Sequence, residues 1–216
     1  MFDLDGTIAE TGIEIALAVN DSLRQSGFAT VSQQQVNGWI GHGTLELMVK
    51  ALAFVMNTSL DTARTHSELG QLKLHFDLSY QRHCGTVSTL YPQVRESLTV
   101  LKARGVKLAV VTNKDRHYTD IILNQHQLVE MVDMVIGGDE VPAKKPDPAG
   151  LKRCLDFFNI APERALFVGD SAIDAATARN ANMAVWLLPY GYNQHQDVRE
   201  CAPDRVITSF AALIEN

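Results

Sequence analysis

Cysteine is scarce in this chain of 216 residues, and its three copies lie far apart without a CxxC pair. Cys84, Cys154 and Cys201 therefore fit neither a disulfide framework nor a zinc knuckle, and we expect reduced, small apolar side chains. The chain also lacks any run near the roughly 18 apolar residues that span a bilayer, and its N-terminus has no basic segment followed by an apolar one. We therefore expect a cytoplasmic protein with no membrane partner.

Positive charge is not in excess either. The 19 Lys and Arg residues are outnumbered by 25 Asp and Glu residues, and the net charge of −6 argues against a nucleic-acid partner. The sequence has no internal repeat, which excludes solenoids and propellers. Hydrophobic residues make up 46% of the chain, which is enough to build the core of one or two domains.

Residues 13–84 have a helical pattern throughout, with no strand signal. Ile13, Leu17 and Leu23 form a sparse apolar face at helical spacing, and denser apolar faces follow. Breaks that contain glycine divide the region into several short helices. We therefore predict a separate all-helical unit here.

The pattern changes after Tyr91 and Pro92, where short apolar runs begin to alternate with helical segments. Strands separated by helices of this kind form parallel sheets covered on both faces. We predict an α/β fold with a Rossmann-like doubly wound parallel sheet, built from residues 1–12 and 85–216, with 13–84 inserted as a small helical domain. The expected strands are 106–111, 132–136, 165–168 and 184–188, and the expected helices are 94–104, 115–127, 148–158 and 172–182.

Polar residues gather where the predicted strands end, which is where such sheets place their ligand sites. Asp3 and Asp5 are two residues apart in an extended segment and share one face, and Asp170 would add a third carboxylate from a neighbouring strand. Crowded carboxylates need a cation, and a set of oxygen ligands beside a phosphate favours Mg²⁺. Lys145 and Thr112 offer a positive charge and a hydroxyl, and both suit phosphate oxygens.

These residues belong to four motifs that resemble those of the haloacid dehalogenase superfamily of phosphotransferases. They are DLDGT at 3–7, Thr112 at the end of AVVT, Lys145 in KKPDP, and GDSAID at 169–174. The helical insert is similar to the cap domain of that superfamily, and the strings TNK, KPDP and YGYN resemble its phosphoglycolate phosphatases. The resemblance implies a phosphoric monoester hydrolase of carbohydrate metabolism, acting on a small phosphorylated metabolite as a monomer or a homodimer.

The resemblance also implies a two-step reaction through an aspartyl phosphate. Asp3 would attack phosphorus, and Asp5 would donate a proton to the leaving group and then activate water. Lys145 would take part in catalysis, and together with Thr112 and Asn113 it would bind the phosphate oxygens.

Two further groups of residues follow from the same resemblance. Asp3, Asp170 and the backbone carbonyl of Asp5 would hold the Mg²⁺ ion. Asp174 would lie behind these ligands and orient Lys145 or a metal-bound water, and Ser171 would lie in the same outer layer or touch the ion itself.

The helical insert offers one candidate for substrate contact. His42 stands between two glycines, which allow a close approach, and its imidazole could meet a carboxylate; a histidine in a solvated loop is the alternative. Lys114 and Arg116 could attract an anion, or could lie in solvent at the start of a helix.

Only Met1 and Phe2 precede the first aspartate, so the first core strand is expected to be truncated. A short strand in the middle of a sheet would leave backbone groups unpaired and a gap in the core. We predict hydrolysis of 2-phosphoglycolate to glycolate and phosphate. Pyrophosphate, a sugar phosphate or a nucleotide monophosphate are alternative substrates, and a non-catalytic phosphate-binding or regulatory protein is the alternative function.

Overall fold

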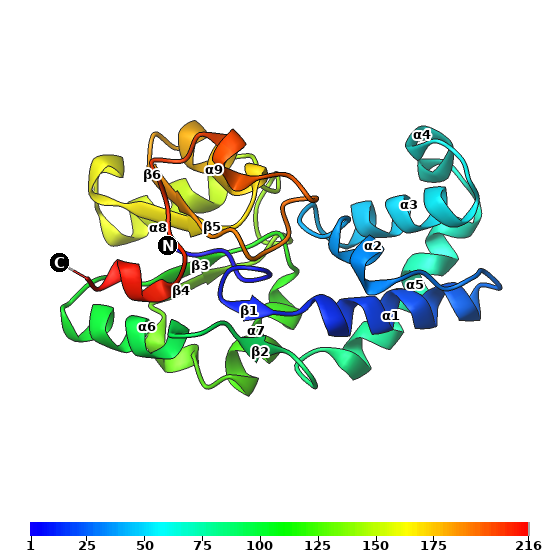
Figure 1. The fold of residues 1–216 in the computed structure, drawn as a ribbon, viewed down its shortest axis with the longest axis horizontal. Helices are drawn as coiled ribbons and strands as arrows, with labels where there is room; N and C mark the ends of the chain where they lie inside the picture. Colours follow the sequence, from blue (N-terminus) through cyan, green and yellow to red (C-terminus); the bar gives the residue numbers. More distant parts are fainter. Residues whose placement is uncertain (216) are drawn as a thin grey trace.

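The computed structural model describes residues 1–215, and its helices and strands separate into two regions (Figure 1). The first region holds five helices, which extend to one side of the molecule. They are α1 (Gly12–Gln25), α2 (Gln33–Asn37), α3 (Thr44–Val55), α4 (Leu60–Arg64) and α5 (Glu68–His83). The predicted domain boundary at 13–84 follows this division closely, and as a domain assignment it stays a prediction.

The packing of α1 differs from the expected pattern. The sequence predicts that Ile13, Leu17 and Leu23 form the apolar face of this helix. This is wrong for Ile13 and Leu17, which are 42% and 40% exposed. Ile15 and Val19 are buried instead, together with Leu23, because this face of α1 packs on α5. A residue spacing of four along the helix brings these three side chains onto one stripe.

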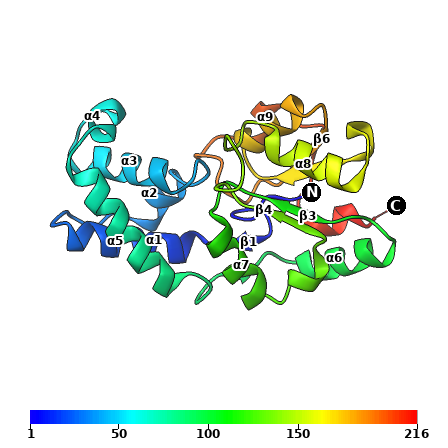
Figure 2. The same ribbon diagram turned by 180° about the vertical axis from the view of Figure 1, so that it is seen from behind.

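The second region is a parallel sheet between helices, as the sequence predicts. β4 (Met134–Ile136) pairs with β3 (Ala109–Val111), and β5 (Leu166–Gly169) pairs with β6 (Ala184–Leu187), which pairs with β7 (Arg205–Val206). Helices α8 (Ala149–Phe158) and α9 (Ala172–Asn180) cover one face, and α6 (Val94–Ala103) and α7 (Arg116–Gln125) cover the other (Figures 1 and 2). The α/β doubly wound fold with an inserted helical unit is confirmed.

Short elements complete the region. An antiparallel pair, β1 (Ala9–Glu10) and β2 (Thr89–Leu90), lies where the chain leaves the sheet region and returns to it. The short 3₁₀ helices are η1 (Val129–Met131), η2 (Pro162–Arg164), η3 (Val198–Cys201) and η4 (Phe210–Leu213). No helix within residues 1–215 is long and apolar enough to cross a membrane.

The N-terminal residues take the central position of the sheet, between β3 and β5. Phe2 forms parallel bridges to Val110 and to Val168, and its ring is buried and stacks on Phe210 at 5.6 Å between ring centroids. A cavity of about 420 Å³ lies beside Met1 and Phe2, and its lining includes Leu166 and Val168 of β5 and Leu108 just before β3. The cavity lies where a gap was expected from the short run before Asp3, and the two bridges still connect the halves of the sheet.

Candidate active site

Three acidic side chains meet at the carboxyl ends of the central strands. Asp3 follows the central segment, Asp170 follows β5, and Asp174 lies on the first turn of α9. One carboxylate oxygen of each lies within 4.8 Å of the others, and all three residues are buried. Parallel strands bring their carboxyl ends to one edge of a sheet, so Asp3 and Asp170, which are 167 positions apart in the chain, become neighbours.

The carboxylate of Asp170 is held by neighbours that leave no room for larger side chains. The Thr7 hydroxyl donates to one oxygen at 2.6 Å, and the backbone N–H of Tyr192 donates to the other at 2.5 Å. A Cβ atom at Gly6 or Gly191 would lie 2.5 or 2.2 Å from that second oxygen. Both glycines are therefore required for the position of this carboxylate.

Lys145 and Asp174 form a buried ion pair beside Asp3. The Lys145 ammonium lies 2.7 Å from Asp174 Oδ1 and 2.9 Å from Asp3 Oδ1. The second oxygen of Asp174 accepts hydrogen bonds from the backbone N–H groups of Asp170 and Ser171 and from the Ser171 hydroxyl. Ser171 is the N-cap of α9 and forms a capping box with Asp174. Asp174 lies against Lys145 and Ser171 also lines the pocket, and the supporting role expected of both residues stays a prediction.

Burial and like charge change the acidity of the cluster. Burial, with further contributions from Asp174 and Asp5, raises the pKa of Asp3 to about 6 against the opposing effect of Lys145. Burial, followed by the Asp174 and Asp3 charges, also raises the pKa of Asp170. Burial alone would lower the pKa of Lys145, but Asp174 and Asp3 outweigh it and raise that pKa.

The donor set fits a hard divalent cation. Three buried carboxylates and one ammonium leave two negative charges in excess when all are ionised, and a divalent cation would balance them. Asp3 Oδ1 is also buried without a well-aligned hydrogen bond among the described residues, although Lys145 is close. Oxygen ligands without histidine or cysteine are typical of Mg²⁺.

Asp5 lies across the site from this cluster and has its own partners. Its carboxylate accepts a hydrogen bond from the Thr11 hydroxyl at 2.7 Å, and the Lys114 ammonium lies 2.9 and 3.1 Å from its two oxygens. Lys114 is buried, and sequence reasoning did not assign it to the site. Its place directly after the TN of the second motif was the available signal. Arg116, the other cation weighed there, pairs with Asp120 on the surface of α7.

Thr112 and Asn113 follow β3 and are both buried at the site. The Asn113 amide donates to the carbonyls of Gly41 and Lys145, and its oxygen accepts from the Lys145 N–H at 2.7 Å. The side chain thus fixes the loop that carries Lys145 and ties it to the helical unit. Phosphate binding by either residue stays a prediction.

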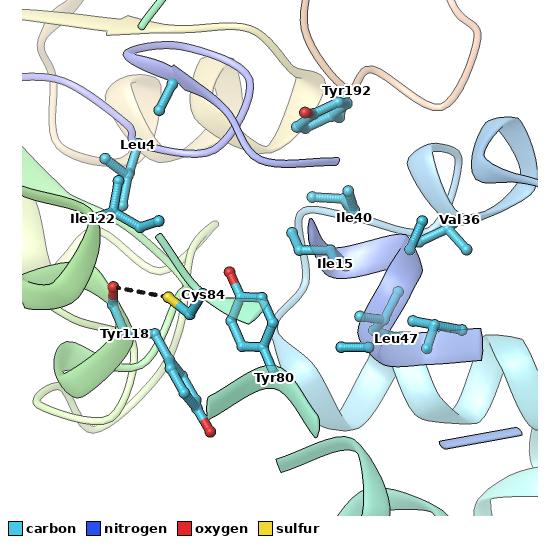
Figure 3. Packing of buried hydrophobic residues seen from close by; sticks show 14 of the residues in the cluster. Leu4, Ile15, Val36, Ile40, Leu47, Tyr80, Cys84, Tyr118, Ile122 and Tyr192 are labelled. Carbon is cyan, nitrogen blue, oxygen red and sulfur yellow. Dashed lines mark hydrogen bonds between the residues drawn. The ribbon is translucent and has the colours of Figure 1, made fainter. Parts of the chain in front are cut away.

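A pocket with a cavity volume of about 50 Å³ joins the two halves of the site. Asp3, Asp5, Thr112 and Asp170 line it from the sheet side. The helical unit supplies the apolar and aromatic wall, which Figure 3 shows from close by. Its members include Ile15, Ile40, Leu47, Phe76 and Tyr80.

The His42 side chain does not line this pocket. Its neighbours Gly41 and Gly43 line the pocket, but the imidazole lies outside it, with Nε2 3.5 Å from the Gln194 side-chain nitrogen. Burial, with a smaller contribution from Lys50, lowers its pKa. The structure thus does not bring His42 to the other predicted substrate-binding residues, because the loop turns its side chain toward Gln194.

Comparison with known sequences gives a family match over most of the chain. The family model described as haloacid dehalogenase-like hydrolase matches residues 1–188. A phosphoglycolate phosphatase of Haemophilus influenzae is 36% identical over 213 residues, which cover 99% of this chain and 95% of the relative. A phosphoglycolate phosphatase of Nitrosospira multiformis is 36% identical over 209 residues, which cover 97% and 90%.

Solved structures also match this chain over nearly its whole length. The crystal structure described as a predicted phosphoglycolate phosphatase from Haemophilus somnus 129PT superposes with a TM-score of 0.92 at 34% identity, covering 99% of this chain and 94% of the other. A phosphoglycolate phosphatase-like structure from Lactobacillus delbrueckii has a TM-score of 0.89 at 23% identity, covering 98% and 94%, and supports the fold alone.

Proposed function

Because the chain belongs to the haloacid dehalogenase-like hydrolases and is a phosphatase of that family, we propose that it hydrolyses 2-phosphoglycolate to glycolate and phosphate with the aid of Mg²⁺. The observation that carries the proposal is a pocket lined by buried Asp3 and Asp170 on one side and by Asp5 on the other, with Lys145 in contact with Asp3 from behind the lining. The phosphoglycolate phosphatases that match nearly the whole chain support the choice of substrate.

The first chemical step belongs to Asp3. Its carboxylate attacks phosphorus, the bond from phosphorus to the ester oxygen breaks, and an aspartyl phosphate forms. Asp5, in its protonated form, gives its proton to the departing glycolate oxygen. Thr11 and Lys114 hold the Asp5 carboxylate in place for this transfer.

In the second step Asp5 acts as a general base instead of a general acid. Its carboxylate takes a proton from a water molecule, whose oxygen attacks phosphorus and displaces the Asp3 carboxylate. The Lys145 ammonium, fixed by Asp174 at 2.7 Å, balances negative charge beside Asp3 in both steps. Phosphate is released and both aspartates return to their starting states.

Mg²⁺ would be held by Asp3, Asp170 and the Asp5 backbone carbonyl, and when bound it neutralises the charge of the carboxylates and the phosphate. The pocket is small, with a cavity of about 50 Å³, so the helical unit must move to admit any of the candidate esters, and a nucleotide requires a larger movement than 2-phosphoglycolate.

Phosphate release from a panel of esters tests the proposal. We expect turnover with Mg²⁺ that is highest on 2-phosphoglycolate, is abolished by EDTA and is restored by excess Mg²⁺. Pyrophosphate, a sugar phosphate and a nucleotide monophosphate complete the panel, and a maximum on any of these would replace the substrate. Binding of 2-phosphoglycolate without turnover by the folded protein would favour a regulatory role.

A further inference from the structure

Lys114 is the one cationic side chain among the described residues that line the pocket. Its side chain is 5% exposed, and its ammonium pairs with Asp5 at 2.9 Å. The ammonium also lies 4.9 Å from the centroid of the Tyr80 ring. Lys145 approaches Asp3 from behind the pocket lining, so the two lysines serve different parts of the site.

Away from Asp5, Lys114 is surrounded by aromatic side chains and by the charge of the buried Glu14 carboxylate, which accepts a hydrogen bond from the Tyr80 hydroxyl at 3.2 Å. Tyr80 and Tyr118 pack against each other at 4.7 Å between ring centroids, and Phe76 stacks on Tyr80 at 5.3 Å. These side chains come from α5 and α7 and line the same pocket, as Figure 3 shows for the two tyrosines. A substrate that extends past Asp5 therefore meets a largely aromatic wall in which Lys114 is the one cation among the described lining residues, while Glu14 lies outside that lining.

We propose that the Lys114 ammonium is a carboxylate subsite, which binds the acidic end of the substrate while the phosphate lies at Asp3. The inference rests on the proposed function and names the residue that selects its substrate. In 2-phosphoglycolate the carboxyl carbon is only two covalent bonds from the ester oxygen. Asp5 must reach that ester oxygen, and Lys114 is in direct contact with Asp5, so a carboxylate two bonds from that oxygen comes within reach of the ammonium.

The subsite also explains discrimination against neutral esters. A buried ammonium loses its contacts with water, and a ligand that offers no anion leaves it with only the Asp5 carboxylate and the nearby charge of Glu14. A carboxylate brings a charge-assisted contact instead. An ester of the same length with a neutral end fills the same space without that contact, and is bound less well.

The test compares two substrates in one variant. Lys114→Gln keeps most of the side-chain length and removes the charge, and kcat/KM is measured with Mg²⁺ on 2-phosphoglycolate and on 2-hydroxyethyl phosphate. Loss of the Asp5 partner slows both reactions by a common factor, so the ratio of the two values is the readout. We expect the preference for 2-phosphoglycolate to fall by about 10–100-fold, the range for a contact to a charged group. A ratio that stays within about threefold of the wild type overturns the subsite.

Control variants separate this result from a general loss of charge or fold. Lys144→Gln removes a positive charge from a side chain that pairs with Asp115 outside the pocket, and should leave the ratio unchanged. Lys114→Arg keeps the charge and should keep most of the preference. If Lys114→Gln does not fold, glycolate and ethylene glycol are compared as inhibitors of the wild type. Stronger inhibition by glycolate supports the subsite, and equal inhibition overturns it.

The outcomes also separate the two proposals. A wild-type enzyme that prefers 2-phosphoglycolate, together with a Lys114→Gln variant that retains the preference, overturns the subsite and leaves the proposed function intact. A wild-type enzyme that hydrolyses both esters without preference overturns the choice of substrate and the subsite together.

Discussion

Replacing the proposed nucleophile with asparagine should abolish turnover and at the same time stabilise the metal-free protein. Asp3 is buried, and its pKa is raised from 3.8 to about 6, mainly by burial. Because the folded pKa lies above the unfolded one, stability is lost as the pH rises through this window. A shift of about two units corresponds to roughly 3 kcal/mol at neutral pH. Asp3→Asn mimics the uncharged acid and should recover most of that free energy.

The assay is thermal unfolding in EDTA, at pH 7.5 and at pH 5. For a chain of this length about 3 kcal/mol corresponds to a rise in Tm of about 6–12 °C at pH 7.5. At pH 5 the wild-type carboxyl is largely protonated, so the advantage of Asp3→Asn should shrink to about half. Mg²⁺ should stabilise the wild type more than the variant, because the variant lacks one charged ligand.

A control variant and a contrary outcome complete the experiment. Asp156→Asn changes an exposed aspartate on α8 and should alter Tm by little at either pH. An Asp3→Asn protein that is less stable than the wild type at pH 7.5, by an amount that does not change with pH, would refute the argument from buried charge. Retained phosphate release would refute Asp3 as the nucleophile.

Three further predictions concern positioning, packing and thiol chemistry. Asp174→Asn weakens the hold on Lys145 and should lower kcat by about 10–100-fold, with far-UV circular dichroism unchanged and a larger Mg²⁺ requirement; an unchanged kcat would argue against a positioning role. Phe210→Ala removes a fully buried ring and should cost about 3–5 kcal/mol in urea unfolding; a loss below about 1 kcal/mol would show that the ring is not part of a close-packed core. Burial raises the pKa of Cys154 to about 11, so about a thousandth of it is thiolate at pH 8. Iodoacetamide should therefore label the partly exposed Cys201 first, and mass spectrometry showing faster labelling of Cys154 would contradict its burial.

Much of the fold was predictable because it depends on periodicity and strand ends. Apolar runs separated by helical segments specify a parallel sheet, and such a sheet brings Asp3, Thr112 and Asp170 to one edge. Strand lengths were less predictable: the expected strand over 106–111 is formed only by Ala109–Val111. The Leu108 N–H donates to the Asp133 carboxylate instead of to a strand.

Side-chain direction in the helical unit was beyond the sequence. Glycines beside His42 predict a close approach of the backbone, and Gly41 and Gly43 do line the pocket. Whether the imidazole points inward depends on how the loop packs against residues near Gln194, a contact between segments about 150 positions apart. Lys114 is the opposite case. A lysine at the start of a helix is usually solvated, and its burial here depends on the ion pair with Asp5, a residue distant in the sequence.

The hydrogen bond from Thr7 to Asp170 joins residues 163 positions apart, and this separation has a consequence for how the protein folds. Contacts between distant segments form late, because closing a long loop costs entropy before the contact repays it. The helices of residues 12–83 pack mainly on one another, α1 on α5 above all, over separations much shorter than 163 positions, so they can form while the carboxylates are still apart. During refolding, helical circular dichroism should therefore recover before enzymatic activity. The return of activity therefore shows that the whole chain has reached its native arrangement. The return of helix content does not show this.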